Sequence, residues 1–127
     1  MTTLGATLGS IAPGAVEISL APNPAITQQH GFVHAGAVSA IADTAAGYAA
    51  LSLMREGVGV LTTEFKINLV APATGERIIA RARVVKPGRT LTLVQTDVFA
   101  EDQGKEKLVA LFTATMMSIE GRDGIGD

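Results

Sequence analysis

One long run of small, apolar residues places the strongest constraint on how this chain can fold. It extends from His34 to Met54, and Asp43 is the only formally charged residue between His34 and Arg55. Apolar residues recur in it at spacings of three and four, which is typical of a helix with an apolar stripe. The predicted stripe consists of Val38, Ile41, Ala42, Ala45, Ala49 and Leu53. Roughly twenty residues at about 1.5 Å each predict a helix of about 30 Å.

The surroundings of Asp43 in this run indicate a function for its carboxylate. Its neighbours three and four positions away on the helix are all small and uncharged. They are Ser39, Ala40, Ala46 and Gly47. Burying an unpaired carboxylate costs several kcal/mol, so Asp43 needs a specific partner or a specific use. A helix N-cap or a lone surface acid is the ordinary alternative, but Asp43 lies well inside the predicted helix, beyond capping range.

Composition bounds the class of protein. The 127 residues form one ordinary domain, and no internal repeat or domain boundary is visible. Charged residues are 17% of the chain and the net charge is −2, so neither nucleic-acid binding nor a polybasic membrane surface is indicated. So few charges favour subunit contacts that hide part of the surface. The absence of cysteine excludes disulfides, thiol catalysis and cysteine–zinc sites.

The expected location is the cytoplasm. No stretch resembles a signal peptide, because residues 1–5 lack a basic start and an apolar core. The predicted helix is about as long as a membrane span. Its alanines and glycines, its one acid and the lack of flanking basic clusters indicate a buried helix of a soluble protein instead.

Strand-like segments surround the predicted helix, and hairpin-length links join most of them. The predicted strands are residues 4–11, 15–20, 60–70, 76–86, 90–100 and 108–119. Alternation in 60–70 places Leu61, Phe65, Ile67 and Leu69 on one side, and Thr62, Glu64, Lys66 and Asn68 on the other. Short links imply an antiparallel sheet. The sequence therefore predicts an α+β fold with one long helix across a sheet of five or six strands.

The residues that open the helix carry a family pattern. Gly31-Phe32-Val33-His34-Ala35-Gly36, followed by Ala42-Asp43 and Gly47, resembles the His-Gly-Gly…Ala-Asp pattern of hotdog-fold acyl-CoA thioesterases. The closest match is the PaaI-like branch of the phenylacetate pathway. Thr62, Asn68-Leu69…Pro72 and Lys86-Pro87-Gly88-Arg89-Thr90 extend the resemblance over nearly the whole chain.

The resemblance implies a hotdog fold, in which an antiparallel sheet wraps one central helix. Residues 1–120 are then a single hotdog domain, and residues 121–127 are predicted to be a disordered tail. The resemblance further implies a homodimer with a continuous sheet and two shared sites at the subunit boundary. Such dimers usually pair again, which predicts a homotetramer.

The start of the predicted helix offers hydrogen-bond donors that thioester hydrolysis needs. The reaction needs a nucleophile or a base that activates water, and donors for the oxyanion that develops on the carbonyl. The first amides of the helix, those of Ala35, Gly36 and Ala37, are unsatisfied and partially positive, so they form an oxyanion site. By resemblance, the Ala35 amide polarises the carbonyl. Asp43 of the other subunit attacks it or activates water, and both alternatives stay open.

The resemblance assigns further residues to the site. The usual Asn or Gln partner falls on Gln28, or on Gln29 if the loop is slipped by one. His34 orients the loop or a water, with a plain hydrogen bond to a loop carbonyl as its ordinary alternative. Arg89, next to Gly88, pairs with a CoA phosphate, unless these two residues are only a hairpin turn.

Two positions depart from the pattern. Ala35 stands where the family has a glycine, which is harmless for an amide donor unless the backbone there needs positive φ. Gly47 stands where the related branch with a glutamate as the acid carries Thr or Ser, so the hydroxyl comes from Thr62 or Thr63 instead. Strand parity puts these two threonines on opposite faces, so only one can serve, and the motif favours Thr62.

The sequence thus predicts an acyl-CoA thioesterase that converts an acyl-CoA and water into a carboxylic acid and free CoA. No metal or redox cofactor is expected, because both histidines lie in one loop without a second ligand cluster. A non-catalytic acyl-CoA-binding hotdog protein is the first alternative, and a buried acid argues against it. A hotdog hydratase or dehydratase is the second, and its loop motif is absent.

Overall fold

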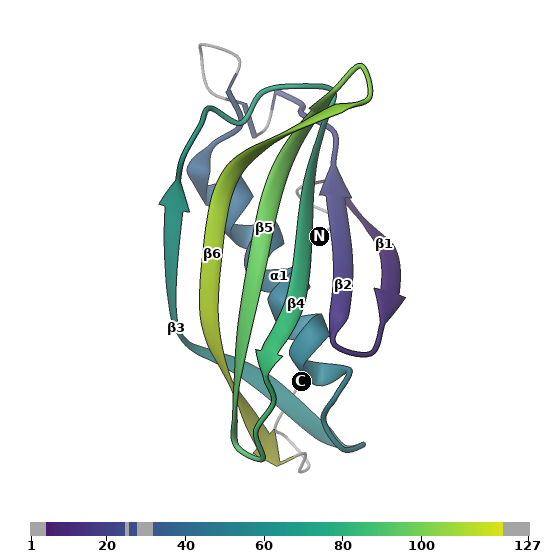
Figure 1. Ribbon diagram of the computed structural model, residues 1–127, viewed down its shortest axis with the longest axis vertical. Coiled ribbons are helices and arrows are strands. Elements are labelled where there is room, and N and C mark those ends of the chain that lie inside the picture. The colour runs from purple at the N-terminus through teal and green to yellow at the C-terminus, as the bar shows by residue number, and fades with distance from the viewer. Residues whose placement is uncertain (1–4, 25, 28–31, 121–127) are drawn as a thin grey trace.

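The structure is a computed structural model that describes residues 5–24, 26–27 and 32–120. In these ranges one helix, α1 (Ala35–Leu51), lies across a six-stranded antiparallel sheet (Figure 1). The strands are β1 (Ala6–Ala12), β2 (Ala15–Leu20), β3 (Val58–Leu69), β4 (Arg77–Lys86), β5 (Leu91–Asp102) and β6 (Lys105–Glu120). Their order across the sheet is β1-β2-β4-β5-β6-β3, which leaves β1 and β3 at the two edges. This architecture confirms the predicted fold class. The tail predicted at 121–127 lies outside the described residues.

The apolar stripe of α1 packs onto the sheet. Ile41, Ala42, Ala45 and Ala49 have no exposed surface. The sheet supplies the larger side chains of the core, which include Ile18, Leu20, Ile78, Val94, Val98, Phe112 and Met116. Alanines on the helix allow its backbone to approach these side chains closely, so the helix sits deep in the curved sheet.

The helix is one turn shorter than predicted, and Leu53 does not belong to its stripe. Leu53 lies beyond the last helical residue and is 45% exposed. The backbone amides of Leu53 and Met54 donate to carbonyls three residues earlier, which tightens the end of the helix. Ser52 holds this turn in place, because its Oγ accepts a 2.7 Å hydrogen bond from the backbone amide of Gly14. Among the described residues no helix is long and apolar enough to cross a membrane.

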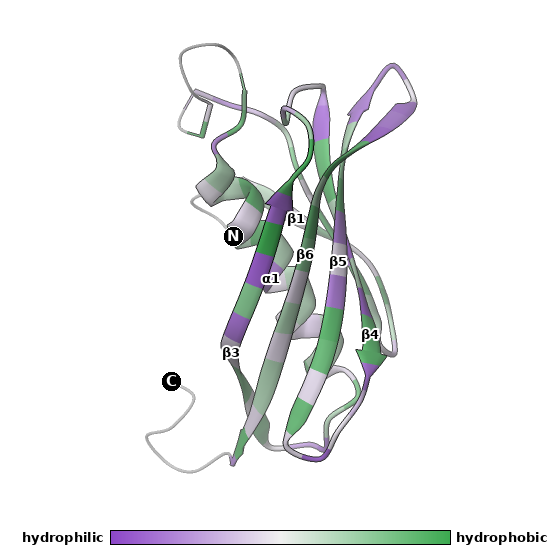
Figure 2. Ribbon diagram, turned by 60° about the vertical axis from the view of Figure 1, so that its left-hand side comes forward, coloured by the Kyte–Doolittle hydropathy of each residue, from purple (hydrophilic) through white to green (hydrophobic). Residues whose placement is uncertain are grey.

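Strand β3 contains a β-bulge, and the predicted sides of its first residues are therefore wrong. Its register with β6 shifts between Thr62 and Glu64. The extra residue reverses the alternation. Thr62 faces the helix, opposite Met116, and Phe65 also faces it, opposite Ala114. Beyond the bulge the predicted alternation holds, and Figure 2 shows hydrophobic and hydrophilic residues alternating along β3.

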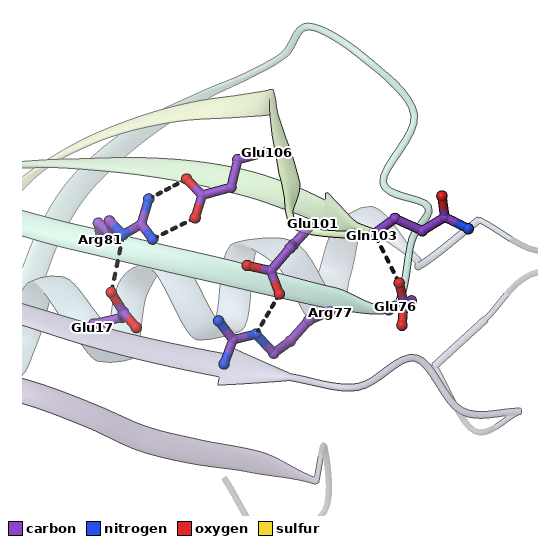
Figure 3. Close-up of polar contacts among 7 residues, drawn as sticks. All are labelled: Glu17, Glu76, Arg77, Arg81, Glu101, Gln103 and Glu106. Atoms are coloured by element: carbon purple, nitrogen blue, oxygen red, sulfur yellow. Dashed lines mark hydrogen bonds and ion pairs between the residues drawn. The ribbon is translucent and has the colours of Figure 1, made fainter.

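The face of the sheet away from the helix carries ion pairs between strands, one of which spans β5 to join β4 and β6 (Figure 3). The Arg81 guanidinium donates to Glu17 at 3.0 Å and to both carboxylate oxygens of Glu106 at 2.6 and 2.7 Å. It also lies 5.1 Å from the centre of the Phe99 ring. These hydrogen bonds hold the pKa of Glu106 below its ordinary value. Arg81 thus links β2, β4 and β6 on the outer face.

Candidate active site

The carboxylate of Asp43 meets a hydroxyl from the edge strand. Oδ1 of Asp43 accepts a 2.7 Å hydrogen bond from Oγ1 of Thr62, which lies on β3. Thr63 points the other way and donates to the carbonyl of Thr115 at 3.1 Å. The structure therefore brings Thr62, and not Thr63, to the acid. In the described part of the chain no Lys, Arg or His forms an ion pair with Asp43, whose side chain is half-buried.

A cleft of about 250 Å³ opens beside this pair. Its lining residues are Asp43, Thr44, Gly47, Tyr48, Leu51, Val60 and Thr62. The Thr44 hydroxyl is already used, because it donates to the carbonyl of Ala40 at 2.8 Å. A Cβ added at Gly47 would lie 3.7 Å from the Val60 side chain, an ordinary contact. Packing therefore does not require glycine at position 47. The space that a side chain would occupy there is part of the cleft.

The N-terminus of α1 presents two free backbone donors. Ala37 and Val38 donate their amides to the carbonyl of His34 at 3.0 and 3.1 Å, whereas Ala35 and Gly36 donate to no acceptor among the described residues. His34 occupies the N-cap position, and its side chain makes no capping hydrogen bond. Ala35 does not have a positive φ, so alanine fits this position without strain. Of the three amides predicted to form an oxyanion site, those of Ala35 and Gly36 are thus exposed and available, whereas the buried Ala37 amide is already used within the helix.

Within one chain, the acid and these donors are apart. Ala35 and Asp43 are eight residues apart on one helix, or about 12 Å by the rise of 1.5 Å per residue. Ala35 lines a different, mostly apolar cleft of about 400 Å³. The other residues around that cleft are Phe32, Val33, Val38, Leu69, Val70, Ala71, Pro72, Ala73 and Val109. Gln28 and its alternative Gln29 lie outside the described residues.

Gly88 and Arg89 lie at the connection between β4 and β5. A Cβ on Gly88 would come within 2.1 Å of the carbonyl oxygen of Leu91, so the turn requires glycine. The two residues line a cleft of about 190 Å³ at the end of the molecule where α1 ends. Leu53, Met54, Arg55, Val58 and Ser118 complete this cleft.

The cleft at Gly88 carries positive charge. Arg55 pairs with Glu120, whereas Arg89 forms no ion pair with any described residue. Arg55 was not among the residues predicted for the site, because its place beside the β4–β5 turn arises only when the helix end and that turn meet in space. Val58 of this cleft and Val60 of the Asp43 cleft both face the helix from β3, so the two clefts follow one strand. No group of three His, Asp or Glu side chains that could hold a metal ion is present in the described ranges.

Comparisons with known proteins point to one family. A family model described as the thioesterase superfamily matches residues 30–107. Acyl-coenzyme A thioesterase 13 of Homo sapiens is 32% identical over 100 residues, which are 78% of this chain and 71% of that protein. A thioesterase family protein from Silicibacter pomeroyi is 52% identical, with a TM-score of 0.93 over 95% of this chain and 89% of that one. A mutant form of the phenylacetic acid degradation protein PaaI from Thermus thermophilus is 27% identical, with a TM-score of 0.79 over 92% and 96% of the two chains.

Proposed function

Because the chain belongs to the thioesterase superfamily and is a hotdog-fold thioester hydrolase of the PaaI-like branch, we propose that it hydrolyses an acyl-CoA with Asp43 as the reacting carboxylate. The hydrogen bond of 2.7 Å from Thr62 to Oδ1 carries this proposal. It fixes one carboxylate oxygen and leaves Oδ2 without a hydrogen bond to any described residue, in a side chain that lines the cleft a thioester would enter. A carboxylate held in this way beside an open cleft is arranged for reaction rather than for stability.

Two routes from this geometry give the same products. In the first, Oδ2 of Asp43 attacks the thioester carbonyl carbon, the thiolate of CoA leaves, and water hydrolyses the resulting mixed anhydride. In the second, Asp43 takes a proton from water as the oxygen attacks the same carbon, and the C–S bond then breaks as the CoA thiolate leaves and takes up that proton. Both routes yield a carboxylic acid and free CoA. Water is the only co-reactant, so the proposed reaction needs no redox cofactor, and neither route includes a metal ion.

The oxyanion donors come from a second copy of the chain in this proposal. One chain cannot place its own Ala35 amide at the carbonyl next to its own Asp43, because the two are about 12 Å apart along the helix. Strand β3 is an edge strand, so a second β3 can pair with it. Antiparallel pairing centred between Phe65 and Lys66 would set Thr62 of one copy beside Leu69 of the other. Leu69 borders the cleft that contains Ala35.

The remaining predicted residues have supporting roles in this dimer. The amides of Ala35 and Gly36 stabilise the oxyanion. His34 and Gln28 orient the entry loop and the carbonyl. Two such dimers then form the homotetramer that the family resemblance predicts.

The positive cleft receives the nucleotide end of CoA. Arg89 binds a phosphate there, and Gly88 keeps the turn tight enough to present it. The pantetheine arm then follows the helix-facing side of β3 past Val58 and Val60 to the carboxylate. This path joins the two clefts that border the strand.

A comparison of wild type with Asp43→Asn tests the proposal. Release of free thiol is measured with a panel of short, long, aryl and hydroxylated acyl-CoAs, and the fold is checked by circular dichroism. We expect the wild type to hydrolyse members of the panel and Asp43→Asn to lose about 10²–10⁴-fold in kcat. Asp97→Asn is the control, because Asp97 is held by Arg83 on the outer face of the sheet.

Three results would contradict the proposal. Asp43→Asn with full activity would exclude Asp43 from the chemistry. Tight binding of acyl-CoA without thiol release by the wild type would indicate a binding protein. Hydration of an enoyl-CoA in place of hydrolysis would indicate a hydratase.

A further inference from the structure

We propose that the acyl chain of the substrate crosses α1 at Gly47 and lies in an apolar groove between α1 and the β1–β2 hairpin. This inference rests on the proposed function, because the groove would hold the acyl part of the thioester. The groove has a volume of about 380 Å³. It is lined by Leu8, Ile11, Val16, Tyr48, Leu51 and Ser52.

The groove adjoins the Asp43 cleft. Tyr48 and Leu51 line both spaces, so the groove and the cleft lie on either side of these two residues of α1. Successive helical residues are turned by about 100°, which puts Asp43 on the β3 side of α1 and Tyr48 on the β1–β2 side. Gly47 lies on the solvent side between them. Because it has no side chain, the ridge of the helix is lowest there, and an acyl chain can pass from one side to the other.

A β-bulge in β1 builds the far wall of the groove. Leu8 and Ile11 are three residues apart, so in a regular strand they would point to opposite faces. The register with β2 shifts between them, with Leu8 opposite Ile18 and Ile11 opposite Val16. Both side chains consequently point to the helix side, although they are 40% and 59% exposed. Bulges commonly re-aim a side chain in this way.

The groove has the chemistry that an alkyl chain needs. The only side-chain oxygen of its lining besides that of Tyr48 is Oγ of Ser52, and this atom is occupied. It accepts from the amide of Gly14 and donates to the carbonyl of Ala49, each at 2.7 Å. A concave, mostly apolar space of this size is typical of small-molecule sites. Because the groove adjoins the cleft of the reacting carboxylate, the acyl chain rather than a separate ligand is the inferred occupant.

The path also sets a length requirement. Asp43 and Leu51 are eight residues apart, or about 12 Å along the helix. A butyryl group therefore ends near the carboxylate, whereas a decanoyl group extends into the groove. Each methylene buried there should raise kcat/KM by about fourfold, which is the factor for ~0.8 kcal/mol. The inferred substrates are acyl-CoAs with extended apolar chains.

The test compares decanoyl-CoA with butyryl-CoA in wild type, Ile11→Asn and Ile11→Leu. We expect Ile11→Asn to lower the ratio of the two kcat/KM values by about tenfold, mainly through KM for decanoyl-CoA. Ile11→Leu should keep the wild-type ratio. The control is Leu93→Asn, which removes a leucine that is 37% exposed on the outer face of the sheet and should leave the ratio unchanged. Thermal unfolding and molecular mass in solution are measured for every variant.

The outcomes separate this inference from the proposed function. An unchanged ratio in folded Ile11→Asn would overturn the inference while acyl-CoA hydrolysis stands. A change of oligomeric mass in Ile11→Asn, without a change of ratio, would show that a second copy covers the groove, and would also overturn it. A wild type that hydrolyses no acyl-CoA of any length would overturn the proposed function itself.

Discussion

Thr62 and Asp43 are joined by a hydrogen bond of 2.7 Å that the bulge in β3 makes possible. Thr62 and Phe65 both face the helix although they are three residues apart, because Thr63 is the extra residue of the bulge. If β3 were a regular strand and Phe65 kept its position facing the helix, the side chain of Thr62 would point to the outer face. The contact between acid and hydroxyl therefore depends on one irregular residue.

Removing the Thr62 hydroxyl should impair turnover without unfolding the protein. Valine has nearly the same shape as threonine, so Thr62→Val mainly deletes the donor to Asp43. A hydrogen bond to a charged group contributes about 1.5–3 kcal/mol, which corresponds to roughly 10–100-fold in kcat. Steady-state kinetics of thiol release provide the measurement.

The neighbouring threonine is the matched control for this experiment. Thr63→Val removes a hydroxyl whose one partner among the described residues is the carbonyl of Thr115, so kcat should stay near the wild-type value. Thr62→Ser restores a donor and should recover much of the activity. Equal effects of Thr62→Val and Thr63→Val would show that the contact with Asp43 has no part in the reaction.

A charge at the free edge of β3 should separate the subunits of the proposed dimer. Phe65 stacks on Phe112 with ring centres 5.2 Å apart, yet 55% of it is exposed in the single chain. Pairing of two β3 strands would cover this residue. Phe65→Lys should therefore shift the solution mass from oligomer to monomer and abolish thiol release, since the Ala35 amide of the second copy is lost. Analytical ultracentrifugation measures the mass.

A lysine at the opposite edge of the sheet serves as the control for the dimer. Thr7→Lys lies on β1, the other edge strand, and should keep both mass and activity. An active wild type that is monomeric at assay concentrations would contradict a site shared between subunits.

Arg89 should matter only for substrates that carry the nucleotide of CoA. Arg89→Gln removes a charge that forms no ion pair with a described residue, and it should raise KM for acyl-CoA by about tenfold. The same acyl group on pantetheine, which lacks the phosphates, should show no such increase. A similar rise in KM for both substrates would place Arg89 in a structural role.

Much of the fold followed from patterns that are local in the sequence. The alternation of 15–20 gave β2 with the bounds that the structure has. The helix start at Ala35 and the apolar positions from Val38 to Ala49 were also correct. These features depend on side-chain periodicity, which a single sequence displays directly.

The errors arose where contacts distant in the sequence decide the local conformation. The bulge at Thr63 is set by pairing with β6, so alternation within β3 alone could not show it. The end of the helix at Leu51 depends on the contact between Ser52 and Gly14, which are 38 positions apart. Arg55 joins Arg89 only because the helix end and the β4–β5 turn meet in space. The Thr62–Asp43 contact was anticipated from the family motif rather than from the strand pattern.

Two glycine-to-alanine substitutions should have opposite effects on stability. In Gly88→Ala the new Cβ would fall within 2.1 Å of the Leu91 carbonyl oxygen, so the β4–β5 turn must shift, at a cost of about 1–3 kcal/mol. In Gly47→Ala the new Cβ makes an ordinary contact at 3.7 Å, and alanine in a helix interior should add about 0.5–1 kcal/mol. Urea unfolding measures both. A Gly88→Ala variant as stable as the wild type would contradict the required close approach.

The pair between Arg81 and Glu106 should make stability depend on pH in the acidic range. The hydrogen bonds from Arg81 hold the pKa of Glu106 below its ordinary value of 4.5, so the unfolded chain takes up this proton more readily than the folded one. The contribution of the pair is complete above the unfolded pKa and is lost as the pH falls through the lower folded value. Glu106→Gln should therefore destabilise the protein at neutral pH, by about 0.2–1 kcal/mol for an exposed pair, and this difference should shrink below about pH 4.5. Urea unfolding across the pH range checks the trend.

Glu56→Gln, which changes an exposed acid without an ion pair among the described residues, should show no such convergence. A stability difference for Glu106→Gln that stays constant from neutral to acidic pH would mean that the carboxylate contributes by packing rather than by its charge.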